Sequence, residues 1–274
     1  MHNPMKLKDY VTLGNALGGL AAMVAAMHGN LDWACYFMVI AWVFDSFDGV
    51  VARMTGGGNK FGSVLDNAAD LIAYSLAPSL IIYLAFTRPA AEGGAGWPIV
   101  AAFILASLPT AFGVVRFARN NVKDIILPEF HLGLPRTAYG LYIATLFTSH
   151  IFHNPWLDAD RHLQGVFYIA AAVFIAATSF LTFTFLPYWS KPLKGSGASK
   201  LVVFSIYWFL ITSLGALLIG LIFLGDARLF ADALFLNFTL YVWLGPLSIP
   251  KHKRREVRRY TQQLIREWNE EMGT

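Results

Sequence analysis

Four aspartates with helical spacing are the residues of this sequence best suited to do chemistry. They are Asp45, Asp48, Asp66 and Asp70, within an otherwise apolar chain. Residues three or four positions apart share one face of a helix, so each pair lies on one helical face. Charges at membrane depth are costly and repel one another, and a bound cation is the simplest compensation. Because the cluster contains only carboxylates, it predicts a site for Mg²⁺, Mn²⁺ or Ca²⁺.

Small residues and one arginine accompany these aspartates. Gly49 and Ala52 lie on the face of the first pair, Arg53 follows directly, and Gly62 precedes Asp66 by one turn. Helix packing for the small residues and an interfacial anchor for the arginine are the alternative interpretations. For the aspartates the alternative is a set of helix caps or pore-lining side chains.

The elements that position these residues are predicted to be membrane helices. The chain is 56% hydrophobic and 14% charged, whereas soluble domains are about a quarter charged. Most of its charge-free runs reach the roughly 20 residues that a spanning helix needs, and the first is too long for a signal-peptide core. A single cysteine, Cys35, excludes an intramolecular disulfide. We predict an all-α polytopic membrane bundle with eight spans at 11–28, 33–53, 61–86, 97–117, 137–153, 164–188, 201–224 and 230–248.

The distribution of charge predicts the orientation of this bundle. All of the 21 Lys and Arg residues except Arg88, Arg161 and Arg228 then lie on the side of the N-terminus. The positive-inside rule puts both termini and the aspartates in the cytoplasm. This asymmetry accounts for the net charge of +4, so we expect no nucleic-acid partner. The tail, 251–274, is predicted to be a basic helix that binds anionic lipid headgroups.

The aspartate stretch resembles the signature of the CDP-alcohol phosphotransferase family, Asp-x2-Asp-Gly-x2-Ala-Arg-x8-Gly-x3-Asp-x3-Asp. Every fixed position is occupied: Asp45, Asp48, Gly49, Ala52, Arg53, Gly62, Asp66 and Asp70. The resemblance implies a six-helix catalytic core, which we expect at 1–190, followed by two additional transmembrane helices at 191–250 and the basic cytoplasmic tail at 251–274. It also implies a homodimer in a bacterial or archaeal cytoplasmic membrane.

The reaction that the resemblance implies is attack of an alcohol hydroxyl on the lipid-linked phosphate of CDP-diacylglycerol, with release of CMP. Two divalent cations, Mg²⁺ or Mn²⁺ with Ca²⁺ as a further candidate, would neutralise the diphosphate and the leaving group. Their implied ligands are Asp45, Asp48, Asp66 and Asp70. Asp70 is also the implied general base. The implied CDP-binding residues are Gly49, Ala52, Arg53 and Gly62.

Two further stretches resemble the family members that use serine as the acceptor. An Arg-x-x-Arg pair precedes Gly133-Leu134-Pro135, and bidentate arginines suit an anionic acceptor. The predicted acceptor-binding residues are Arg116, Arg119 and Arg136. Near the N-terminus this sequence keeps two residues of those members' pattern, Thr12 and Asn15. It departs from the pattern at Lys8-Asp9, where those members have Pro-Asn.

Serine is the expected acceptor, and inositol phosphate, glycerol phosphate and choline are alternatives with the same chemistry. Phosphorylated acceptors need basic residues, and choline needs an aromatic cage. A different class of protein is an ion-coupled transporter that uses intramembrane aspartates. That class favours broken helices and repeated halves, and residues 45–70 have no internal repeat elsewhere in the sequence.

Overall fold

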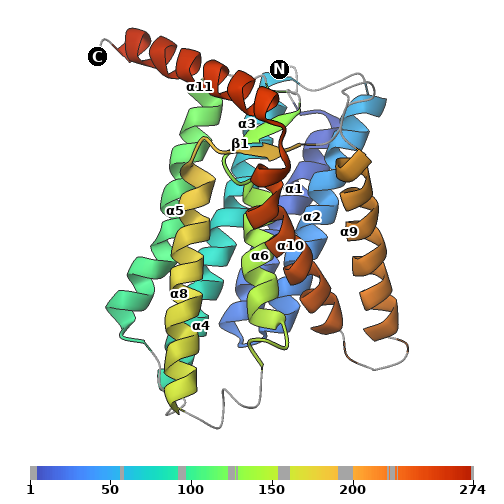
Figure 1. Ribbon diagram of the computed structural model, residues 1–274. Helices are drawn as coiled ribbons and strands as arrows, with labels where there is room; N and C mark the ends of the chain where they lie inside the picture. The colour runs from blue at the N-terminus through green and yellow to red at the C-terminus, as the bar shows by residue number, and fades with distance from the viewer. Residues whose placement is uncertain are drawn as a thin grey trace.

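The structure, a computed structural model, is a bundle of long helices with both chain ends at one end of the bundle (Figure 1). It describes residues 5–55, 59–91, 97–122, 127, 129–153, 161–190, 200–220, 222, 226 and 228–272. The first half of the chain forms α1 (Leu7–Met27), α2 (Leu31–Met54), α3 (Lys60–Leu71), the π-helix η1 (Ile72–Leu76), α4 (Ala77–Ala91) and α5 (Ile99–Val122). The second half forms β1 (Phe130–Leu132), α6 (Arg136–Thr148), α8 (Arg161–Phe183), β2 (Pro187–Trp189), α9 (Lys200–Ile219), α10 (Arg228–Ser248) and α11 (Lys251–Met272).

Six helices in the described part of the chain are long and apolar enough to cross a membrane. Five of them are α1, α2, α5, α8 and α10. The sixth is one continuous helix that begins with α3, passes through η1 and ends in α4. These helices confirm the predicted all-α polytopic membrane bundle, with six candidate spans among the described residues where eight spans were predicted. The seventh predicted span coincides with α9, most of whose first-half side chains lie outside the description.

Two predicted spans differ from the helices that occupy their place. The span predicted at 137–153 is the helix α6, which ends at Thr148 because Ser149 has an extended backbone. Its 13 residues reach only about 20 Å, and all of them except Thr137 and Ala138 are buried. The span predicted to end at 188 stops at Phe183, because residues 187–189 pair with β1 as an antiparallel strand.

The two C-terminal helices of the bundle flank the predicted core. α10 packs against α6, where the Tyr142 and Thr239 hydroxyls are 2.7 Å apart. α9 contacts α2 through the rings of Trp42 and Phe209. The predicted boundary near residue 190 adjoins 191–199, which lie outside the described residues, so the division into a core, two added helices and a tail stays a prediction.

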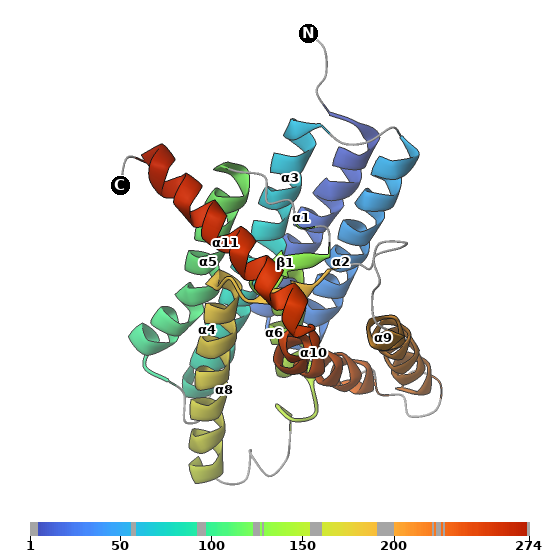
Figure 2. The same ribbon diagram turned by 45° about the horizontal axis from the view of Figure 1, so that its top comes forward.

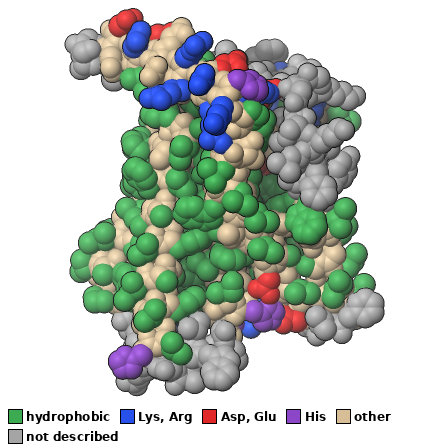
Figure 3. All heavy atoms as spheres, viewed as in Figure 1, with side chains coloured by type: hydrophobic (Ala, Val, Ile, Leu, Met, Phe, Trp, Pro, Cys, Tyr) green, Lys and Arg blue, Asp and Glu red, His purple; other side chains and the backbone are tan. Residues whose placement is uncertain are grey.

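The last helix lies across one end of the bundle, over the β1–β2 pair (Figure 2). Val257 and Leu264 on its inner face are buried against Phe130 and Leu132 of β1. Lys and Arg side chains gather on its outer side, whereas hydrophobic side chains dominate the bundle below (Figure 3). The prediction that the basic tail forms a helix is confirmed.

A π-helix directly after the last aspartate interrupts the third span. Glycines of three other helices pack closely against η1. A Cβ on Gly19 of α1 would lie 2.5 Å from the Cα of Ala73, and a Cβ on Gly140 of α6 would lie 2.9 Å from the Cα of Tyr74. A Cβ on Gly113 of α5 would overlap Ser75. π-Turns occur frequently at functional sites, and this one is fixed by contact with three helices.

Replacing Gly19 tests this packing. Gly19→Ala is expected to lower the free energy of unfolding by about 2–3 kcal/mol, because the new methyl group would meet backbone that cannot rotate away. Thermal unfolding in detergent measures the change. Gly165→Ala in α8 is the matched control, since a Cβ there meets nothing within 4 Å and alanine favours the helix by about 0.5–1 kcal/mol. Equal stability of the two variants would contradict the close approach.

Candidate active site

Helices α2 and α3 bring three of the four aspartates together. Asp45 and Asp48 lie in the C-terminal half of α2, and Asp66 lies on α3. Each offers an oxygen within 4.8 Å of those of the other two, and all three side chains are half-buried. The two helical faces predicted from the spacing therefore meet.

These three carboxylates fit a hard divalent cation. One oxygen of Asp66, Oδ1, is buried with no hydrogen-bond partner among the described residues. A buried carboxylate oxygen without a donor is costly unless a cation compensates it. Since all ligands in the group are carboxylates, Asp45, Asp48 and Asp66 would hold Mg²⁺ or Mn²⁺.

Asp70 lies outside this group of three and is held by two other helices. Its Oδ1 accepts a hydrogen bond of 3.1 Å from Asn15 of α1, and its Oδ2 lies 3.5 Å from Nη2 of Arg136 at the start of α6. The Asp70 side chain is 17% exposed, so a small molecule can reach it. An oriented and accessible carboxylate next to a cation site is suited to accept a proton.

Arg136 is the predicted acceptor residue that contacts an active-site aspartate. Its guanidinium also donates to Asn67 of α3, through Nη2 to Oδ1 at 2.8 Å and through Nη1 to the carbonyl oxygen at 3.3 Å. Asn67 and Asp70 are one turn apart on α3, so the guanidinium spans both side chains. With only 5% of its side chain exposed, Arg136 is fixed in this position.

Arg116 and Arg119 contact the backbone near the β1–β2 pair. Nη1 of Arg116 donates to the carbonyl oxygens of Leu134 at 2.6 Å and Thr182 at 3.0 Å. Arg119 donates to Leu132 at 3.2 Å and stacks over the ring of Phe185 at 5.0 Å. These bonds hold the segment leading to Arg136, and the acceptor-binding role of both residues stays a prediction.

The predicted CDP-binding residues differ in their surroundings. A Cβ on Gly49 would meet within 4 Å only Nη1 of Arg53, at 3.7 Å, so packing in the described residues does not require glycine there. Arg53 is exposed and Ala52 is half-buried. Gly62 is covered by Lys8 and Asp9, with which a Cβ would collide. Their roles in CDP binding stay predictions.

Two residues of α1 belong to the site, although the sequence analysis assigned them no role. Thr12 donates a 2.7 Å hydrogen bond to Oδ2 of Asp48, and Asn15 donates to Asp70. Both are fully buried. Their spacing of three residues within an apolar run is the signal that could have indicated one polar face of a helix.

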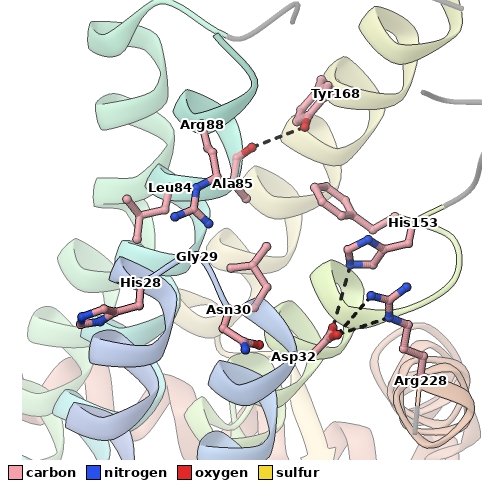
Figure 4. A pocket seen from close by; sticks show the side chains of 12 residues that line it. His28, Gly29, Asn30, Asp32, Leu84, Ala85, Arg88, His153, Tyr168 and Arg228 are labelled. Carbon is pink, nitrogen blue, oxygen red and sulfur yellow. Dashed lines mark hydrogen bonds and ion pairs between the residues drawn. The ribbon is translucent and has the colours of Figure 1, made fainter. Parts of the chain in front are cut away.

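A pocket of about 560 Å³ lies at the other end of the bundle (Figure 4). It includes the N-terminal turn of α2, whereas Asp45 and Asp48 lie near that helix's C-terminus. Within it, Asp32 lies 3.1 Å from Arg228 and 4.0 Å from His153. This pocket therefore lies at the opposite end of α2 from the aspartate site, and its aspartate is paired with basic side chains.

Near this pocket, His150 is expected to make the free energy of unfolding depend on pH. Its Nδ1 lies 2.5 Å from Oδ2 of Asp232, and its Nε2 lies 2.9 Å from Oδ2 of Asp226. Both hydrogen bonds raise the pKa of His150 above its ordinary 6.5, and the bond to Asp232 has the larger effect. Folding therefore favours the protonated ring, whose contribution is complete below pH 6.5 and is lost as the pH rises through the raised pKa. The melting temperature is expected to fall by about 1–2 °C over that rise. His150→Gln should remove this dependence, and an unchanged slope in the variant would contradict the assignment.

Comparison with protein families identifies the class of protein to which this fold belongs. Residues 5–224 match the model of CDP-alcohol phosphatidyltransferase, and the chain belongs to that family. A relative from Helicobacter pylori, named CDP-diacylglycerol–serine O-phosphatidyltransferase, is 32% identical over 52% of this chain and 57% of its own length. The archaetidylserine synthase of Methanothermobacter thermautotrophicus is 38% identical over 29% of this chain and 35% of its own. The CDP-diacylglycerol–serine O-phosphatidyltransferase of Bacillus subtilis is 28% identical over 54% of this chain and 77% of its own length. The chain therefore spans little more than half, or less, of the first two of these relatives.

Proposed function

We propose that this protein transfers a phosphatidyl group from CDP-diacylglycerol to the hydroxyl of serine and releases CMP. The observation that carries the proposal is that three aspartates lie together while the fourth is held separately. Asp45, Asp48 and Asp66 form a compact carboxylate group, whereas Asp70 is held apart from them by Asn15 and Arg136. A cation site beside an oriented base is what attack of a hydroxyl on a diphosphate requires.

The residues of the site divide the reaction among them. Asp70 takes the proton of the acceptor hydroxyl as its oxygen forms a bond to the lipid-linked phosphorus, and the bond from phosphorus to CMP breaks. Asn15 and Arg136 hold the Asp70 carboxylate in place. Two divalent cations held by Asp45, Asp48 and Asp66, with Asp70 as a further ligand, would neutralise the diphosphate and the departing CMP. Arg53 is exposed beside Gly49, where a phosphate can reach it.

Serine is the proposed acceptor because the names of the relatives from Helicobacter and Bacillus contain it. The guanidinium of Arg136, fixed beside Asp70, can hold the serine carboxylate while the hydroxyl faces the base. Inositol phosphate, glycerol phosphate and choline stay as alternative acceptors. An ion-coupled transporter is the alternative of a different class.

The proposed setting is the cytoplasmic membrane of a bacterium or archaeon. The lipid chains of the donor stay in the bilayer, and the aspartates and both termini face the cytoplasm. The helix α11, whose outer side is basic (Figure 3), lies at the same end of the bundle as α3 (Figure 1), in agreement with the positive-inside rule. We also propose a homodimer, with membrane lipids and the two substrates as partners.

The test is CMP release by the purified protein in lipid nanodiscs. CDP-diacylglycerol is supplied with Mn²⁺ or Mg²⁺, and serine, inositol phosphate, glycerol phosphate and choline are offered separately. We expect release with serine alone and none after the cation is removed with EDTA. Release with another acceptor would keep the mechanism and change the substrate. Bound Mn²⁺ without CMP release under any condition would favour the transporter.

A further inference from the structure

One face of α1 carries three polar residues at the spacing of successive helical turns. Lys8, Thr12 and Asn15 stand at i, i+4 and i+7 and are all buried. Thr12 donates to Asp48 and Asn15 donates to Asp70, so two members of this face each hold one aspartate of the site. The third member, Lys8, lies where the family pattern described above has proline.

Lys8 lies against the helix that carries Asp66. Its ammonium is 3.3 Å from Oδ1 of Asp9, and only 9% of its side chain is exposed. Both side chains are seated on Gly62, where a Cβ would collide with them. Asp66 is one turn further along the same face of α3, so the ammonium of Lys8, which covers Gly62, lies one helical turn from the Asp66 position.

Asp9 determines where this ammonium lies. Its Oδ2 accepts a 2.7 Å hydrogen bond from the backbone nitrogen of Lys6 at the start of α1, which fixes the carboxylate. Oδ1 is buried and is left to Lys8. Since Asp9 is fully buried, the pair behaves as a fixed dipole beside the carboxylate group.

We propose that Lys8 is a positioning residue of the aspartate site that acts on Asp66 through its charge, whereas Thr12 and Asn15 act on Asp48 and Asp70 through hydrogen bonds. Its charge compensates the cluster in the absence of a cation and opposes cation binding when one arrives. This inference rests on the cation site in the proposed function. It predicts opposite effects of the two members of the pair on the affinity for a divalent cation.

The experiment measures Mn²⁺ binding to the full chain in nanodiscs by calorimetry. Lys8→Met removes a positive charge beside the ligands and is expected to tighten Mn²⁺ binding about 3–10-fold. Asp9→Asn removes a negative charge and is expected to weaken it by a similar factor. The double variant removes both charges and should bind within about twofold of the native protein, because the net charge of the pair is unchanged.

The sign of the Lys8→Met effect separates this role from a merely structural one. Loss of packing can only weaken binding, and in that case both single variants would change in the same direction. Weaker or unchanged binding in Lys8→Met, or absence of Mn²⁺ binding in the native protein, would overturn the inference. Thermal unfolding without Mn²⁺ identifies any variant that does not fold. If that variant is Lys8→Met, the double variant is compared with Asp9→Asn, from which it differs only at Lys8, and tighter binding in the double variant is expected. Opposite signs without CMP release would leave this inference standing and remove the proposed activity.

Discussion

Asp70→Asn is expected to reduce CMP release about 10²–10⁴-fold, the usual contribution of a general base. The amide cannot accept the proton of the acceptor hydroxyl, although its oxygen can still accept the hydrogen bond from Asn15. The Mn²⁺ held by Asp45, Asp48 and Asp66 should still bind, whereas a second Mn²⁺ that uses Asp70 as a further ligand should bind more weakly. Single-turnover CMP release and Mn²⁺ calorimetry on the same preparation measure the two effects.

Asp66→Asn is the matched control for this experiment. It also replaces a carboxylate of α3 by an amide, but within the group of three, so both Mn²⁺ binding and CMP release should be lost. If Asp70→Asn lost Mn²⁺ binding to the same degree, Asp70 would act mainly as a ligand. Retention of more than about a tenth of the activity by Asp70→Asn would contradict the assignment of the base.

Arg136→Met is expected to lower the free energy of unfolding by about 3 kcal/mol and CMP release about 10²-fold. The loss of stability follows because Asp70 would keep a largely buried charge without its partner, and Asn67 would lose two donors. The loss of rate follows because the base would no longer be held at the attacking hydroxyl. Chemical denaturation in detergent and single-turnover CMP release measure the two effects.

The double variant Asp70→Asn/Arg136→Met separates charge from packing in this pair. Removing both charges should recover most of the lost stability, because no unpaired charge is left, while activity stays absent. If the double variant is as unstable as Arg136→Met, the arginine stabilises α6 by packing alone, and its ion pair with Asp70 contributes nothing.

The aspartate site could be predicted because helical periodicity alone determines which residues share a face. One contact between neighbouring helices is then enough to bring Asp45 and Asp48 of the first helix close to Asp66 of the next. The roles of Thr12 and Asn15 could not be predicted, because they depend on the rotation of α1 about its own axis against both helices. Periodicity within a single helix carries no information about that rotation.

The ends of the helices were harder to predict, because hydropathy reports apolar surface and not backbone conformation. The apolar run that begins at Thr137 continues through Ile151 and Phe152, although the helix ends at Thr148. The π-helix after Asp70 leaves no trace in composition, since it changes only the hydrogen-bond register of an apolar segment. The structure places it at Ile72–Leu76.

The short, enclosed α6 has a consequence for how the site responds to the surrounding lipid. A helix exposed to acyl chains tilts or distorts when bilayer thickness does not match its hydrophobic length. From Tyr139 to Thr148 every residue of α6 is buried in protein, so this mismatch does not act on it directly. Changes in thickness act instead on the spans around it and reach Arg136 only through their packing. The pairing of Arg136 with Asp70 is therefore insulated from the length of the lipids that surround the protein.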